Sequence, residues 1–178
     1  MDRRQLLSLI PAVALAPAAL ARAMEPHLLH SPDMPHDLDP VEKLKKPLSE
    51  WKRLLSDAEY RVLFEEATER AGTSPLDAEK RAGTFVCAAC FLPLFESSAK
   101  FDSGTGWPSF TAPLPEHVET KRDFKLLWPR TEYHCARCGG HQGHVFNDGP
   151  RPTGKRYCNN GVALRFVARE QALPELRQ

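Results

Sequence analysis

The 178-residue sequence has almost no net charge, because 24 lysines and arginines stand against 23 aspartates and glutamates. Proteins that bind nucleic acid or anionic lipid carry a basic patch that complements the negative phosphates of these partners. The charge balance therefore argues against both classes of partner. The sequence also shows no internal repeat, and so gives no sign of a repeat architecture.

Long hydrophobic runs are also missing. An apolar stretch near the amino terminus, from Leu6 to Leu20, is interrupted by Pro11 and Pro17. A membrane-spanning helix needs about 20 consecutive apolar residues, so this stretch is too short for a stable span.

The same stretch has the pattern of an export signal. Arg3 and Arg4 form a basic start, the apolar run follows, and residues 21–23 supply the small side chains that a signal peptidase recognises. Paired arginines before Gln-Leu-Leu resemble the twin-arginine signal, which places the mature protein in a bacterial periplasm. An ordinary secretory signal or an uncleaved anchor is the alternative interpretation.

Composition divides the chain into four segments. Residues 1–23 are predicted to be the signal peptide, and residues 24–47, rich in proline, an extended linker that need not pack. Residues 48–168 form the predicted folded domain, and residues 169–178 a carboxyl-terminal tail.

The folded part opens with a predicted helix. Ser56 is followed three residues later by Glu59, so that each side chain can satisfy the other's backbone amide at the helix start. Apolar residues recur at helical spacing from Tyr60 to Ala67, and Gly72 is expected to end the helix.

After Gly83 the pattern changes to short β-branched and aromatic runs separated by turn-forming residues. Predicted strands cover residues 84–86, 117–121, 124–128, 132–134, 145–146 and 162–167. Short strands without alternating helices predict a mainly β domain with antiparallel pairing.

Cysteine is scarce, with five residues in the chain, and four of them form two Cys-x-x-Cys pairs: Cys87, Cys90, Cys135 and Cys138. Two such knuckles complete a tetrahedral set of thiolates, which is typical of structural zinc. Disulfides within each pair are one alternative in an exported protein, although a bridge across so small a loop is strained. A Cys₂His₂ site made of Cys135, Cys138, His141 and His144 is another, but it would leave Cys87 and Cys90 without a role.

The zinc assignment leaves Cys158 as a free thiol. Arg156, two residues away on a candidate strand, projects to the same side and favours the thiolate. His141 and His144 are uncommitted imidazoles suited to delivering a proton. Asn160 is a polar neighbour able to orient either group, and Trp107 lies among turn-forming residues, where a ring often lines a pocket.

Each of these residues also has a structural explanation. A lone cysteine on a strand is often an inert small hydrophobe, and a tryptophan is often simply packed. Their combination favours the functional interpretation.

Four sequence motifs resemble the methionine-R-sulfoxide reductases, the type B family. They are CAACFLPLF (87–95), FDSGTGWPSF (101–110), RTEYHCARCGGHQGHVFNDGP (130–150) and PTGKRYCNNGVALRF (152–166). The resemblance covers residues 48–168. It implies two antiparallel β-sheets with helical additions, a structural zinc held by the four paired cysteines, and reduction of the R epimer of methionine sulfoxide in oxidised proteins.

The resemblance also implies roles for single residues. Cys158 matches the nucleophile that becomes a sulfenic acid. His141 and His144 match the pair that binds and protonates the departing oxygen. Trp107 matches the ring that packs on the substrate methyl group, whereas Asn160 and Arg156 match residues that support the nucleophile.

The sequence departs from the family at three positions. Thr105 stands where many members have a resolving cysteine, so we expect the sulfenic acid to be reduced by an external thiol, either a thioredoxin-like protein or a small molecule. Asn159 replaces a usual aliphatic residue and Gln142 a frequent leucine.

Two functions of other classes stay open at this stage. A zinc-stabilised β module that binds a partner without turnover has the same architecture. A hydrolase with a Cys–His pair is the other, although no orienting third residue or oxyanion loop is evident.

Overall fold

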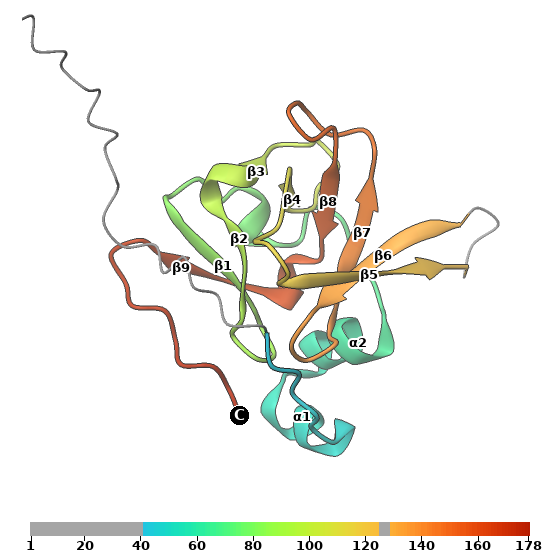
Figure 1. The fold of residues 1–178 in the computed structure, drawn as a ribbon, viewed down its shortest axis with the longest axis vertical. Coiled ribbons are helices and arrows are strands. Elements are labelled where there is room, and N and C mark those ends of the chain that lie inside the picture. The colour runs from blue at the N-terminus through green and yellow to red at the C-terminus, as the bar shows by residue number, and fades with distance from the viewer. Residues whose placement is uncertain (1–40, 125–128) are drawn as a thin grey trace, which may run out of the picture. The chain divides into compact units, whose positions relative to one another are not determined.

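The computed structural model describes residues 41–124 and 129–178 (Figure 1). The predicted export signal therefore lies outside the described residues, as does all of the predicted linker before residue 41. Residues 41–47 are irregular but packed, because Val41 and Leu44 contact the core and the Leu44 amide donates to the Arg137 carbonyl at 2.7 Å. Within the described residues, no helix is both long enough and apolar enough to cross a membrane.

Two short α-helices precede the strands. Helix α1 (Leu48–Leu54) buries Trp51, and helix α2 (Asp57–Glu65) begins at the predicted capping box. The Ser56 hydroxyl accepts from the Glu59 amide at 3.3 Å, and the Ser56 amide donates to the Glu59 carboxylate at 2.8 Å. The predicted end at Gly72 is wrong. Glu66 adopts the left-handed conformation and ends α2 there.

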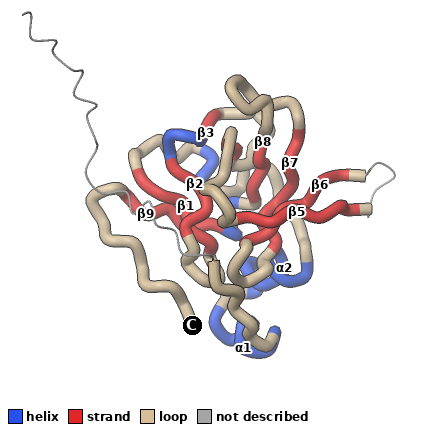
Figure 2. Tube along the Cα trace, in the orientation of Figure 1, coloured by secondary structure: helices blue, strands red, loops and turns tan. Residues whose placement is uncertain are grey.

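The strands form two antiparallel sheets, as predicted (Figures 1 and 2). The three-stranded sheet has the order β2 (Pro93–Glu96), β1 (Gly83–Cys87), β9 (Leu164–Ala168). The six-stranded sheet has the order β3 (Lys100–Phe101), β4 (Ser109–Phe110), β8 (Arg156–Asn159), β7 (His141–Phe146), β6 (Arg130–Cys135), β5 (Val118–Asp123). Single 3₁₀ turns cover Pro75–Asp77, Ser97–Ala99 and Gly161–Ala163.

Most predicted strands overlap observed ones, but two do not fit. Phe124 lies beyond the end of β5, and residues 125–128 fall outside the described residues. The predicted strand 162–167 starts only at Leu164, because Gly161–Ala163 form a 3₁₀ turn. The amides of Gly161 and Val162 donate to Glu69 and are not available to a strand partner.

An aromatic core fills the space between the two sheets. Phe95 of β2 stacks on Phe110 of β4 with ring centroids 4.1 Å apart, and Phe85 of β1 meets the same ring at 5.0 Å. Tyr133 of β6 and Tyr157 of β8 make an edge contact at 5.3 Å. Aromatic pairs at these distances add to the hydrophobic stabilisation of a core, so the contacts of Phe110 with Phe95 and Phe85 hold the two sheets together.

Candidate active site and metal centre

The four paired cysteines converge on one point. Cys87 ends β1 and Cys135 ends β6, whereas Cys90 and Cys138 lie in the turns that follow. The four sulfurs all lie within 4.8 Å of one another. Each turn is closed by a backbone hydrogen bond to the carbonyl of its first cysteine. The Phe91 amide donates to the Cys87 carbonyl and the Gly139 amide to the Cys135 carbonyl, both at 2.9 Å.

The geometry and chemistry of this cluster fit a metal ion. Cys87 Sγ lies 3.7 Å from Cys138 Sγ, and Cys90 Sγ lies 3.5 Å from Cys135 Sγ. A tetrahedral ion with metal–sulfur bonds of about 2.3 Å separates its ligands by roughly 3.8 Å. All four cysteines are unbridged. Burial raises the pKa of the Cys87 and Cys135 thiols well above the ordinary value, so thiolates here need a cation between them.

Neither alternative use of the cysteines is seen in the described residues. None of the four forms a disulfide, and the cluster includes neither His141 nor His144. The histidines instead contact carboxylates of the neighbouring strands.

A separate cavity of about 230 Å³ surrounds Cys158. It is lined by Thr68, Thr105, Trp107, Arg130, Gly143, His144, Phe146, Arg156, Cys158, Asn159 and Asn160. The structure therefore gathers five of the six residues predicted for the active site around one cavity. His141 does not line it.

Cys158 lies on β8 between two strands that each face it with a polar side chain. In the strand register it is opposite Ser109 of β4 on one side and His144 of β7 on the other. Burial raises the pKa of the Cys158 thiol, whereas the Arg156 charge and hydrogen bonding by Thr105 and Ser109 oppose that rise. The thiol is thus partly buried but has a cation and two hydroxyl groups available to hold its thiolate.

Arg156 is itself fixed from two directions. Its Nε and Nη2 donate to the two carboxylate oxygens of Asp148 at 2.9 and 2.8 Å. Its guanidinium carbon lies 4.4 Å from the centroid of the Phe146 ring. A bidentate carboxylate pair and a ring contact orient the planar group, so the charge beside Cys158 has a defined position.

The two histidines occupy different environments. His144 Nε2 lies 2.8 Å from Asp123 Oδ2, and Arg130 donates to the same oxygen at 2.7 Å. His141 Nδ1 lies 2.9 Å from Glu132 Oε1, an ion-pair distance without the geometry of a hydrogen bond. Burial lowers the pKa of His141. His144 faces the cavity, whereas His141 is buried and lies 5.5 Å from the His144 ring, measured between ring centroids.

Three hydroxyl groups form a network next to the thiol. Ser103 Oγ lies 2.8 Å from both Thr105 Oγ1 and Ser109 Oγ. The Ser109 hydroxyl also lies 3.1 Å from the Trp107 carbonyl. The residue that replaces a resolving cysteine is therefore part of a hydrogen-bonded group that contacts Cys158.

Trp107 and Asn160 are held by backbone groups. The Trp107 indole donates to the Glu69 carbonyl at 3.3 Å. The Asn160 side chain accepts from the Glu69 amide at 3.0 Å and donates to the Gln142 carbonyl at 3.0 Å. Asn160 thus orients the turn after Cys158 through backbone contacts, and not through a direct bond to the thiol or an imidazole.

The two other departures from the family compensate each other. Asn159 and Gln142 are both fully buried, and the Asn159 amide donates to Gln142 Oε1 at 3.3 Å. The Tyr133 hydroxyl donates to Asn159 Oδ1 at 2.6 Å, and Gln142 Nε2 lies 3.5 Å from Cys87 Sγ. Each buried amide therefore finds partners, which avoids the cost of an unsatisfied polar group.

Several residues in or around the cavity were not predicted from the sequence. Asp123 and Arg130 pair across the β5–β6 hairpin, and Thr68, Ser109 and Glu69 approach the site from distant segments. Ser109 falls within the FDSGTGWPSF motif, whereas no local pattern marks Asp123, Thr68 or Glu69.

The comparisons with known proteins agree with this geometry. A family model described as the SelR domain matches residues 55–168. The peptide methionine sulfoxide reductase MsrB of Bradyrhizobium diazoefficiens is 54% identical over 126 residues, which cover 70% of this chain and 91% of the relative. The MsrB of Pseudomonas putida is 50% identical over 134 residues, 74% of this chain and 100% of the relative. The chloroplastic peptide methionine sulfoxide reductase B1 of Arabidopsis thaliana is 45% identical over 141 residues, 79% of this chain and 70% of the relative. The motifs, the two-sheet fold and these matches agree, and the chain belongs to the SelR-domain family, the type B methionine sulfoxide reductases.

Proposed function

We propose that the protein reduces the R epimer of methionine sulfoxide in oxidised proteins back to methionine. The observation that carries the proposal is Cys158, which shares one cavity with Trp107, Arg156 and His144. Family membership supplies the reaction class, and this cavity supplies a nucleophile, a cation and an imidazole in contact with one space.

In the first step the Cys158 thiolate attacks the sulfoxide sulfur as the oxygen takes up a proton, and a sulfur–sulfur bond forms. Transfer of the hydroxyl group from the substrate sulfur to Cys158 then breaks both this bond and the sulfur–oxygen bond, so that methionine leaves as a thioether and Cys158 becomes a sulfenic acid. Arg156 stabilises the thiolate before attack, because its charge opposes the effect of burial on the thiol pKa. The Trp107 ring packs on the methyl group of the substrate.

The departing oxygen needs a proton during this step. His144 is the cavity imidazole, and its Nε2 contacts Asp123, so its other nitrogen is free to face the substrate. Asp123 holds the ring orientation in the way that a carboxylate orients a catalytic histidine. His141 does not line the cavity, and it assists through its contact with the His144 ring.

The second half of the cycle uses a thiol from outside the chain. Two external thiols reduce the sulfenic acid to Cys158 thiol, form a disulfide between themselves and release water. The reductant is a thioredoxin-like protein or a small thiol. The support is Thr105, which occupies the position where many members of the family have a resolving cysteine. Its hydroxyl group contacts Cys158.

The metal at the four-cysteine cluster is proposed to be zinc with a structural role. Four thiolates with no open position are typical of structural zinc, which adds stability and does not react. Cys87, Cys90, Cys135 and Cys138 would hold it.

A binding module without turnover is the second candidate. The cavity disfavours it, because a module that only binds a partner has no need for a free thiol beside an arginine and a carboxylate-oriented histidine.

The two epimers of a methionine sulfoxide peptide, supplied separately with dithiothreitol, test the reaction class. We expect methionine release from the R epimer only. Replacing Cys158 by serine should lower kcat/KM at least about a thousand-fold, since a hydroxyl is a far weaker nucleophile than a thiolate. The variant should keep its bound metal. Equal turnover of both epimers, or an active Cys158→Ser protein, would reject the proposal.

A cysteine introduced at residue 105 tests the need for an external thiol. After one turnover without reductant, mass spectrometry of the wild-type protein should show oxidised Cys158 and no internal disulfide that includes it. Thr105→Cys should instead form a 105–158 disulfide, because residue 105 contacts the nucleophile. Thr105→Ser, which keeps the hydroxyl, serves as the matched control. An internal disulfide of Cys158 in the wild-type protein contradicts the expectation.

We also propose that the protein is exported to the periplasm by the twin-arginine route, with residues 1–23 removed. The support is the pair Arg3 and Arg4 ahead of the apolar run. Cell fractionation with amino-terminal sequencing should find the processed chain in the periplasm. Changing both arginines to lysine keeps the charge but should retain the unprocessed chain in the cytoplasm. Normal export of that variant would point to an ordinary secretory signal.

A further inference from the structure

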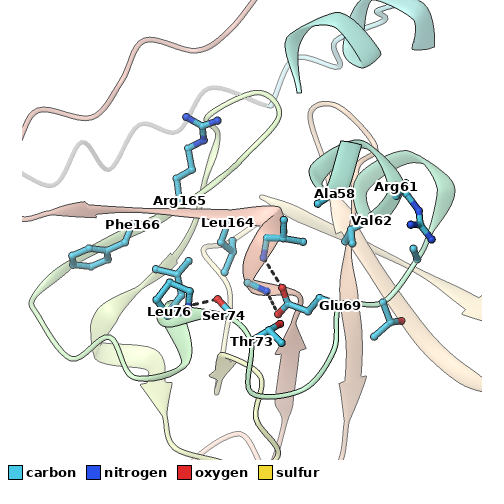
Figure 3. Close-up of a pocket in the computed structure, with 15 residues that line it drawn as sticks. Ala58, Arg61, Val62, Glu69, Thr73, Ser74, Leu76, Leu164, Arg165 and Phe166 are labelled. Atoms are coloured by element: carbon cyan, nitrogen blue, oxygen red, sulfur yellow. Dashed lines mark hydrogen bonds between the residues drawn. The ribbon is translucent and has the colours of Figure 1, made fainter. Parts of the chain in front are cut away.

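Glu69 uses all of its polar groups on two loops of the active site. Its carboxylate accepts from the Gly161 amide at 2.6 Å and from the Val162 amide at 2.9 Å (Figure 3). Its own amide donates to the Asn160 side chain at 3.0 Å, and its carbonyl accepts from the Trp107 indole at 3.3 Å. One residue therefore binds both the turn after Cys158 and the ring that lines the cavity.

Close packing around these bonds shows that the loops are built to meet. A Cβ atom on Gly161 would lie 1.9 Å from the Ser74 hydroxyl and 3.3 Å from the Glu69 carboxylate. The Gly72 amide donates to the Gly106 carbonyl at 2.7 Å, and a Cβ on Gly106 would lie 2.8 Å from the Gly72 nitrogen. Only glycine at residues 106 and 161 allows the segment after α2 to approach both loops.

The segment that carries Glu69 also separates two cavities. Thr68 lines both the cavity around Cys158 and a second cavity of about 550 Å³. Glu69 lines the second cavity (Figure 3) and does not line the cavity around Cys158. It thus acts on the active site from behind its wall, without touching the thiol.

We propose that Glu69 is a positioning residue for sulfoxide reduction, which holds the Trp107 ring and the Asn160–Val162 turn in fixed relation. The proposal rests on the proposed function. The carboxylate anchors the residue to the turn, and this anchor places the Glu69 carbonyl where it receives the indole N–H. Substrate binding then depends on Glu69, because the ring that packs on the substrate methyl group is placed by it.

The carboxylate is suited to this position because it accepts two backbone N–H groups at once. A glutamine of the same shape has one accepting oxygen, so one amide would face an NH₂ group and lose its partner. Hydrogen bonds to charged groups are stronger than neutral ones, and an unpaired buried donor adds a further cost.

The test compares Glu69→Gln with Glu65→Gln, which changes an exposed glutamate at the end of α2. With an R-sulfoxide peptide and fixed dithiothreitol, we expect Glu69→Gln to raise KM about tenfold, as one charge-assisted bond implies, and to keep kcat within about twofold. Glu65→Gln should match the wild-type protein.

A second measurement does not depend on activity. NMR follows the exchange of the Trp107 indole N–H with water, and the signal is assigned by its absence in Trp107→Phe. This exchange should be faster in Glu69→Gln than in the wild-type protein or in Glu65→Gln. If Glu69→Gln fails to fold, the same two measurements on Glu69→Asp decide.

The outcomes separate the proposals. Unchanged KM and unchanged indole exchange in Glu69→Gln would overturn the positioning role. A loss of kcat and melting temperature with both of these unchanged would overturn it as well, since it indicates a structural role alone. If the wild-type protein shows no turnover, the proposed function fails, and indole exchange still tests Glu69.

Discussion

The convergence of four cysteine sulfurs is the interaction on which the structure depends. Cys87 closes β1 of the three-stranded sheet and Cys135 closes β6 of the six-stranded sheet, so one cluster joins the two sheets at a buried point. Burial disfavours thiolates unless a cation lies among them. A cation bound here would therefore supply both the charge that the cluster needs and a cross-link between sheets that local sequence does not connect.

The active site follows from this cross-link through one strand. Strand β7 begins at His141, three residues after Cys138, and pairs with β8 so that His144 lies opposite Cys158. Gln142 of β7 contacts Cys87 Sγ and also Asn159, the residue next to the nucleophile. A change at the four-cysteine cluster would thus alter the register of β7, the strand that carries His144, although the cluster and the active site share no residue.

The sequence was most informative where chemistry is encoded by spacing. Cys-x-x-Cys pairs, the Ser56–Glu59 capping box and the long motifs around Cys158 each specify geometry over a few residues, and all three were found as expected. Contacts between distant segments were not predictable. Residues 162–167 alternate like a strand, but Glu69, about 90 residues earlier in the chain, accepts the amides of Gly161 and Val162, and Gly161–Ala163 form a turn. Helix α2 likewise ends at Glu65 and not at Gly72, because Glu66 adopts the left-handed conformation.

The metal content of the purified protein decides whether the cysteine cluster holds the two sheets together. We expect one zinc ion per chain, measured by elemental analysis together with thermal unfolding. Cys138→Ser should lose the metal and the cooperative unfolding transition, whereas Cys158→Ser should keep both. A metal-free wild-type protein that unfolds cooperatively at the same temperature as the metal-loaded one would contradict the claim that this cluster holds the two sheets together.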